Sequence, residues 1–120
     1  MVAAEHVGEA VVPEPGLRIG TRSDGAWAVV SFAGDLDLAG MRAADEAVIA
    51  AVGNGAEGVL IDLTGVTFMG SEGIRLLLRA QEAGEGAGRP VRILAGEGAA
   101  RRLIELVGLS ERLGIDGSPG

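Results

Sequence analysis

A short and nearly continuous apolar segment, residues 58–63 (Gly-Val-Leu-Ile-Asp-Leu), limits the possible folds of this chain more than any other feature. Such a run is typical of a central strand that is covered on both faces. Apolar residues then recur at helical spacing at Ile74, Leu77 and Leu78, and a second apolar run follows at residues 91–94. This order of strand, helix and strand predicts a parallel crossover, which is right-handed in almost all proteins.

The rest of the chain also alternates between strand-like and helix-like segments. Residues 17–22 alternate apolar and polar side chains, Ser23-Asp24-Gly25 favours a turn, and a more apolar segment begins at Trp27, which together predict a hairpin. The expected elements are strands 17–22 and 27–32, a helix over 40–52, strand 58–63, a helix over 72–84, strand 91–94, a helix over 99–107 and an edge strand at Ile115. We therefore expect an α/β fold, with a mixed four- to five-stranded sheet and about three helices packed on it.

Glycine clusters are expected to end the helices. Gly53-Asn54-Gly55 should end the first helix, because both residue types tolerate the left-handed conformation. The three glycines within residues 84–88 predict a flexible turn, and their place after a helix argues against a dinucleotide-binding loop, which follows a strand. The last helix is expected to be closed by Gly108. Its apolar stripe should lie in the core and consists of Leu103, Ile104, Leu106 and Val107, whereas Arg101 and Arg102 should face solvent.

A chain of 120 residues supports one hydrophobic core, so we expect a single domain over residues 17–116. Residues 1–16 contain two prolines and scattered acids, which predicts a loose acidic N-terminal extension with room for one irregular edge strand. Residues 117–120 should form a disordered tail. The leader lacks the features of a secretory signal and no apolar run is long enough to cross a membrane, so a cytoplasmic location without membrane insertion is expected.

Composition excludes several functions. The net charge of −7 would repel nucleic acid phosphates, so no direct nucleic acid partner is expected. All ten basic residues are arginines, which rules out a phosphate-binding P-loop lysine, and the absence of cysteine removes thiolate metal sites and cysteine nucleophiles. The single histidine, His6, lies in the acidic leader and is expected to be inert. No enzymatic activity, catalytic residue, metal or cofactor is predicted, and a hydrolase or nucleotide-processing site is a disfavoured third alternative, because the nucleophile–base pairs that it needs are missing.

Ser71 is the most informative single residue, because it follows a buried strand and precedes a helix. It is a candidate N-cap, and the exposed start of a helix also favours negative charge such as a phosphate. A plain helix cap and a phosphorylation site therefore both remain open for Ser71 on these grounds alone. Glu72, immediately after it, should stabilise the helix start but repel an added phosphate.

Three aspartates near the expected strand ends have competing interpretations. Asp35 and Asp37 could form a carboxylate pair for metal binding or acid–base chemistry, but no histidine or further acid completes such a site, and a turn role is favoured. Asp62, at the end of the expected strand 58–63, should accept hydrogen bonds from loop amides.

Residues 17–115 resemble the STAS domain, which is shared by anti-sigma factor antagonists and the cytoplasmic tails of sulphate transporters. The resemblance rests on four motifs in the family's order: Gly34-Asp35-Leu36-Asp37, residues 61–66 (Ile-Asp-Leu-Thr-Gly-Val), residues 68–73 (Phe-Met-Gly-Ser-Glu-Gly) and residues 103–109 (Leu-Ile-Glu-Leu-Val-Gly-Leu). A chain that consists of little else is similar to the antagonist branch.

The resemblance implies a partner-switching regulator. In that family the unmodified antagonist binds an anti-sigma factor that is also a serine kinase with a histidine-kinase-like ATP fold, and a sigma factor is released. Phosphorylation of the serine that aligns with Ser71 ends the complex, and a phosphatase of the PP2C type restores it. On this analogy, the partner-binding residues are expected to be Gly34, Asp35, Asp37, Met69, Gly70, Ser71, Glu72, Gly73 and Arg75.

The motif around Ser71 departs from the family pattern at both neighbours. The family usually has aspartate at the position of Gly70, and serine or threonine is common at the position of Glu72. A second hypothesis follows: a constitutive, non-phosphorylated STAS interaction module that serves as a scaffold or as a transport-complex subunit.

Overall fold

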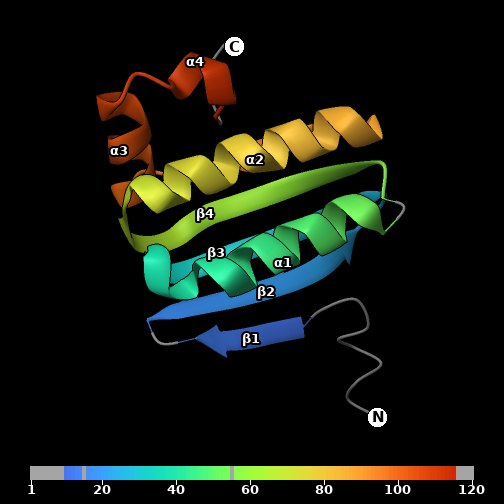
Figure 1. The fold of residues 1–120 in the computed structure, drawn as a ribbon, viewed down its shortest axis with the longest axis horizontal. Coiled ribbons are helices and arrows are strands. Elements are labelled where there is room, and N and C mark those ends of the chain that lie inside the picture. Colours follow the sequence, from blue (N-terminus) through green and yellow to red (C-terminus); the bar gives the residue numbers. More distant parts are fainter. Residues whose placement is uncertain (1–9, 15, 55, 116–120) are drawn as a thin grey trace.

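Five strands form one mixed sheet in the order β1-β2-β3-β4-β5 (Figure 1). The structure is a computed structural model that describes residues 10–14, 16–54 and 56–115. Neighbours β1, β2 and β3 are antiparallel, whereas β4 runs parallel to both β3 and β5. The strands are β1 (Ala10–Glu14), β2 (Leu17–Asp24), β3 (Trp27–Leu36), β4 (Gly58–Met69) and β5 (Val91–Leu94). The α/β class and the mixed sheet are as predicted.

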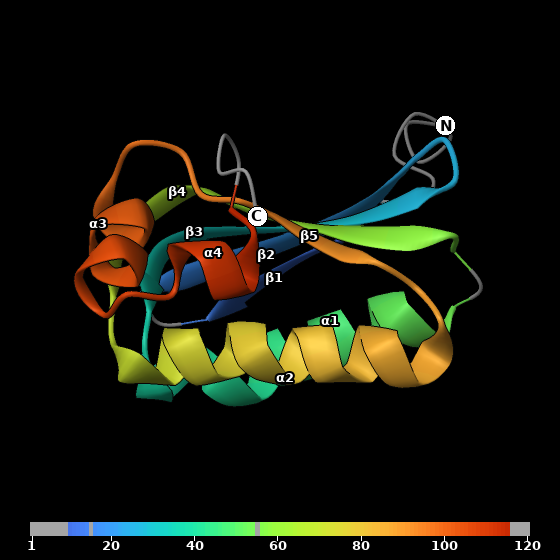
Figure 2. The same cartoon turned by 90° about the horizontal axis from the view of Figure 1, so that it is seen from above.

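Two long helices connect the parallel strands and lie on the same face of the sheet (Figure 2). Successive crossovers of one hand that step in one direction across a sheet place their helices on one side. The helical segments are a 3₁₀ turn η2 (Leu38–Gly40), α1 (Met41–Gly53), α2 (Ser71–Ala87), α3 (Ala99–Leu106) and α4 (Ser110–Leu113). Helix α4 is a further helical turn that the sequence pattern did not predict.

The hydrophobic core fills the space between α1, α2 and the sheet. Phe32 and Ile61 come from the central strands, Val48 from α1 and Leu77 from α2, and each is at most 1% exposed. Full burial of such side chains contributes about 1.5–3 kcal/mol each. Arg79 of α2 forms an ion pair with Asp45 of α1. Its Nη2 donates to Asp45 Oδ1 at 2.9 Å and to Oδ2 at 3.0 Å, and the pair links the two helices.

Strand β4 is an internal strand between β3 and the edge strand β5, whereas the middle strand of the sheet is β3, and β4 also differs from its prediction in length and in covering. It continues to Met69, six residues beyond the predicted end, and two bulges each insert one extra residue opposite β3. Ser31 pairs with Asp62 but Ala33 with Gly65, and later Gly34 pairs with Val66 but Asp35 with Phe68. The prediction that both faces are covered is wrong, since Leu60 and Asp62 are only half-buried on the face away from α1 and α2.

Helix α2 is longer than predicted, and the prediction of a flexible turn over residues 84–88 is wrong. The helix passes through Gly84 and Gly86 and ends at Gly88, which has a φ of 72°. Gly84 is buried where α2 crosses the start of β5: a Cβ there would lie 2.5 Å from the Arg89 carbonyl oxygen and 2.5 Å from Val91 Cγ2. This glycine therefore serves close packing of helix on strand rather than chain flexibility.

The first and third helices carry smaller corrections. Helix α1 ends without a left-handed residue at Gly53 or Asn54, and Gly55 lies outside the described residues. In and just after α3, Ile104 is buried as predicted, but the core assignment is wrong for Leu106 and Val107, which are 82% and 47% exposed. The predicted solvated face is also wrong for Arg101, whose side chain is 19% exposed and donates to the Gly96 carbonyl oxygen, whereas Arg102 is exposed.

Both ends of the described chain join the sheet. Residues 10–14 of the predicted extension pair with β2, and Ile115 forms a parallel bridge with Ile93. Residues 1–9 with His6, and the predicted tail 117–120, lie outside the described residues. Within the part of the chain that the structure describes, no helix has the length and apolar character needed to cross a bilayer.

Candidate functional site

Ser71 opens α2 directly after the internal strand β4, with its side chain exposed. The residue in the N-cap position is Gly70, with φ −99° and ψ −176°, so the prediction that Ser71 itself is the N-cap is wrong by one residue. The N-cap is the last residue with extended dihedrals, and here the chain turns one residue earlier than predicted. Because glycine has no side chain, no side-chain oxygen caps this helix start. Ser71 is thus the first helical residue at an exposed helix N-terminus.

The loop that follows β3 lies beside the start of α2. Asp35 pairs with Phe68 and Leu36 with Met69 at the ends of two parallel strands, and the Gly70 amide donates to the Leu36 carbonyl oxygen at 3.2 Å. Parallel strands end at the same edge of a sheet, so the two motifs separated by more than thirty residues in sequence meet there. The structure thereby brings together the residues 34–37 and 68–73 that the sequence singled out.

Two residues fix the shape of the end of β3 and of the loop that follows it. Gly34 has a φ of 97°, and a Cβ there would lie 2.3 Å from the Gly16 carbonyl oxygen, so only glycine fits. Asp37 caps the 3₁₀ turn η2, because its Oδ1 accepts from the Ala39 amide at 3.2 Å. This is the turn role that the sequence favoured for Asp37.

The predicted partner-binding residues divide into a buried and an exposed group. Met69 is 6% exposed and Gly73 is buried against it, since a Cβ at Gly73 would lie 2.6 Å from Met69 Cγ. These two residues support the surface from below and do not present a side chain to a partner. Asp35, Ser71 and Arg75 are exposed, and the remaining members, Gly34, Asp37, Gly70 and Glu72, are partly exposed.

Two large apolar residues at this edge lie within the predicted partner-binding loops 34–40 and 68–73 but were not among the individual residues predicted to bind. Leu38 in η2 is 72% exposed and Phe68 at the end of β4 is 52% exposed. The available signal was their position, since each lies within or next to a motif that the sequence had already selected. We define the Ser71 surface as the side chains at this edge that reach solvent: Asp35, Asp37, Leu38, Phe68, Ser71, Glu72 and Arg75.

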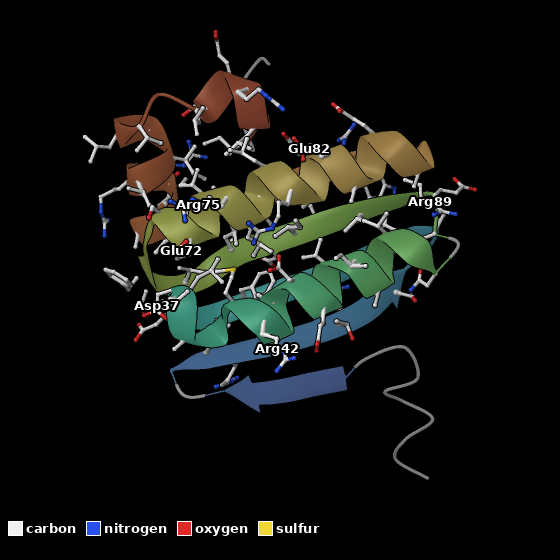
Figure 3. The ribbon with its side chains drawn as sticks, viewed as in Figure 1. Asp37, Arg42, Glu72, Arg75, Glu82 and Arg89 are labelled. Carbon is white, nitrogen blue, oxygen red and sulfur yellow. The ribbon has the colours of Figure 1, made fainter. Side chains whose placement is uncertain are left out.

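The Ser71 surface combines an ion pair with two further acidic groups. Arg75 Nη1 donates to Glu72 Oε1 at 2.8 Å, one helical turn apart, with side-chain exposures of 64% and 28% (Figure 3). Asp35 and Asp37 add two carboxylates at the same edge of the sheet. The surface is therefore apolar at Leu38 and Phe68 and net negative around them.

Among the described residues, no group of three or more His, Asp or Glu side chains could hold a metal ion. Asp62 binds an amide as expected, but inside β4 rather than at its end. Its Oδ1 accepts from the Thr64 amide at 2.9 Å and from the Thr64 hydroxyl at 2.7 Å, at the first bulge. These contacts give Asp62 a structural role in the bulge. The Ser71 surface, with its two exposed large apolar side chains, is suited to contact with another macromolecule.

Comparison with known proteins identifies the family. The family model described as "Mlab, STAS domain" matches residues 19–115. The chain belongs to the STAS domain family. Anti-sigma-F factor antagonist RsfB of Mycobacterium tuberculosis is 34% identical over 86 residues, which cover 70% of this chain and 68% of RsfB.

Two solved structures share the STAS fold with this chain. An anti-sigma factor antagonist from Mycobacterium paratuberculosis has a TM-score of 0.72 at 28% identity, covering 86% of this chain and 87% of that one. The anti-sigma factor antagonist SpoIIAA, in its unphosphorylated form, has a TM-score of 0.65 at 19% identity, covering 76% of this chain and 81% of that one, which shows a common fold. The STAS fold predicted from the four sequence motifs is confirmed.

Proposed function

We propose that this STAS protein is an anti-sigma factor antagonist whose binding is controlled by phosphorylation of Ser71. The observation that carries the proposal is the exposed Ser71 at the start of α2, set beside the loop after β3. The role is supported by the 34% identity to a protein named as an anti-sigma-F factor antagonist. The proposed action is binding, without catalysis, a metal or a cofactor, in the cytoplasm.

The proposed partner is an anti-sigma factor that is also a serine kinase with a histidine-kinase-like ATP fold. Leu38 and Phe68 would be the apolar contacts of the complex, because removal of exposed apolar side chains from water favours association. Asp35, Asp37 and Glu72 would form its polar rim, and formation of the complex would release the sigma factor.

Phosphorylation by that kinase would end the complex without disturbing the fold. A phosphate on Ser71 adds about −1.5 to −2 charges at neutral pH. Beside Leu38 and Phe68 this charge would have to be desolvated in the complex, which is unfavourable. At the first residue of a helix the same charge is well tolerated, because it interacts favourably with the helix dipole. A PP2C-type phosphatase would restore binding.

Incubation of the protein with its genomically adjacent kinase and ATP tests the proposal. Mass spectrometry should find one phosphate, on Ser71, and none on the matched variant Ser71→Ala. Phosphate absent from Ser71 under conditions that modify a control antagonist would exclude the switch.

Gly70 and Glu72, which depart from the family pattern, favour a second candidate: a constitutive scaffold or transport-complex subunit without a phosphorylation cycle. Binding of the partner to Ser71→Asp separates the two. The switch predicts weakened binding by this variant, whereas the constitutive module predicts binding equal to the unmodified protein.

A further inference from the structure

Arg75 lies four residues after Ser71 on α2 and three residues after Glu72. Side chains at both spacings are neighbours on one helix face, so the Arg75 guanidinium can reach either position. In the unmodified protein it is bound to Glu72, with 2.8 Å between Arg75 Nη1 and Glu72 Oε1, and the arginine side chain remains 64% exposed (Figure 3). The pair is thus held at the surface, where a change of partner requires little repacking.

We propose that Arg75 is the internal counter-ion of the Ser71 phosphate and leaves Glu72 to bind it when Ser71 is phosphorylated. A phosphate offers three strong acceptor oxygens and more charge than a carboxylate, and the planar guanidinium matches it with two parallel donors. This inference rests on the proposed function for the presence of the phosphate, and it concerns how the chain responds to it.

The other charged groups near Ser71 do not compete for this role. Arg79, one turn further along α2, donates to both carboxylate oxygens of Asp45. Glu72, Asp35 and Asp37 are acidic and would repel the phosphate. Arg75 is therefore the basic side chain of the Ser71 surface that is placed to compensate the added charge.

The exchange changes two groups at once. The phosphate becomes fixed over the first turn of α2, and the Glu72 carboxylate loses its partner and faces solvent as an additional negative charge. The surface that the partner meets would then differ from the unmodified one at Ser71, Glu72 and Arg75. The repulsion of a phosphate by Glu72, expected from sequence, would be offset by the arginine that Glu72 gives up.

The experiment installs phosphoserine at position 71 of the full chain by genetic encoding, so that no kinase is needed. The phosphate is titrated by ³¹P NMR in the otherwise unchanged protein, in Arg75→Gln and in Arg102→Gln. Arg102 is an exposed arginine of α3 and serves as the matched control for loss of one positive charge. A specific contact with Arg75 should make the second phosphate pKa about 0.3 higher in Arg75→Gln, and leave it unchanged in Arg102→Gln.

A second readout follows the arginine itself. The Nε–H resonance of Arg75 should move between the unmodified and the phosphorylated chain, while that of Arg102 stays in place. Equal phosphate pKa values in the parent and Arg75→Gln, or an equal change in both arginine variants, would overturn the proposal. Failure of the kinase to modify Ser71 would remove the proposed function and leave this measurement intact, so the two failures are distinguishable.

Discussion

Position 70 carries a glycine that the local backbone does not require. Its φ of −99° and ψ of −176° are extended values open to any residue, and a Cβ there would meet only Phe68 Cε2, at an ordinary 3.8 Å. An aspartate at this position, as the family usually has, is therefore compatible with the fold. With glycine here, α2 has no side-chain cap, and the helix start next to Ser71 is therefore less stable than it would be with a capping residue such as aspartate.

Replacement of this glycine by aspartate should stabilise the protein. We expect Gly70→Asp to raise the free energy of unfolding by about 0.5–1 kcal/mol, because the carboxylate caps the first turn of α2 and the unfolded chain loses freedom. Gly70→Ala is the matched control, since it restricts the unfolded chain without adding a cap, and it should be about 1 kcal/mol less stable than Gly70→Asp. Urea denaturation measures both differences. A Gly70→Asp protein less stable than the parent would contradict the cap geometry.

At the scale of elements, the order of strands and helices was predictable because apolar periodicity is strong in residues 58–63, 74–78 and 91–94. The extension of β4 over residues 64–69 was not, because two bulges replace the alternation of buried residues by a spacing of three. The meeting of residues 34–37 with Ser71 depends on strand register, so the resemblance located it while the local pattern could not. The glycines of α2 were misread because the pattern does not reveal what approaches a helix from another element.

Two of those glycines should respond oppositely to the same substitution. Gly84→Ala should lower the free energy of unfolding by about 1–3 kcal/mol, because the new methyl group would clash with the Arg89 carbonyl oxygen, which moves only with the backbone. Gly86→Ala, two residues further along α2 with nothing within 4 Å of its Cβ, should raise it by about 0.5–1 kcal/mol through helix propensity. Thermal or urea denaturation measures both. Equal effects of the two substitutions would contradict the close packing of α2 on β5.

On the scale of the whole molecule, the exposed apolar side chains are distributed over different regions. Leu38 and Phe68 belong to the Ser71 surface, Leu106 and Val107 lie at the end of α3, and Ile49, 63% exposed, lies on α1. Single exposed apolar residues are normal on protein surfaces, whereas two beside a modifiable serine form a basis for binding. The distribution allows the surface to be tested against a control of similar exposure.

Truncation of the two apolar residues should weaken the proposed complex without destabilising the fold. Leu38→Ala and Phe68→Ala should each raise the Kd for the anti-sigma factor about tenfold, because each removes a contact that is desolvated on binding. Their stability should change by less than about 0.5 kcal/mol, since both side chains are exposed. Ile49→Ala, on α1, is the control and should bind as the parent does in isothermal titration calorimetry. A normal Kd for both Leu38→Ala and Phe68→Ala would place the interface elsewhere.

The two bulges of β4 each absorb one extra residue without changing the faces on which Phe68 and Met69 lie. Each inserted residue adds one outward position, so that Leu63, Val66 and Met69 point inward and the residues between them do not. Deletion of one residue of either outward pair, Thr64 or Thr67, would restore the alternation of a regular strand and leave Met69 in the core and Phe68 in solvent. A loss of one codon at either bulge is therefore compatible with the same outward aromatic side chain.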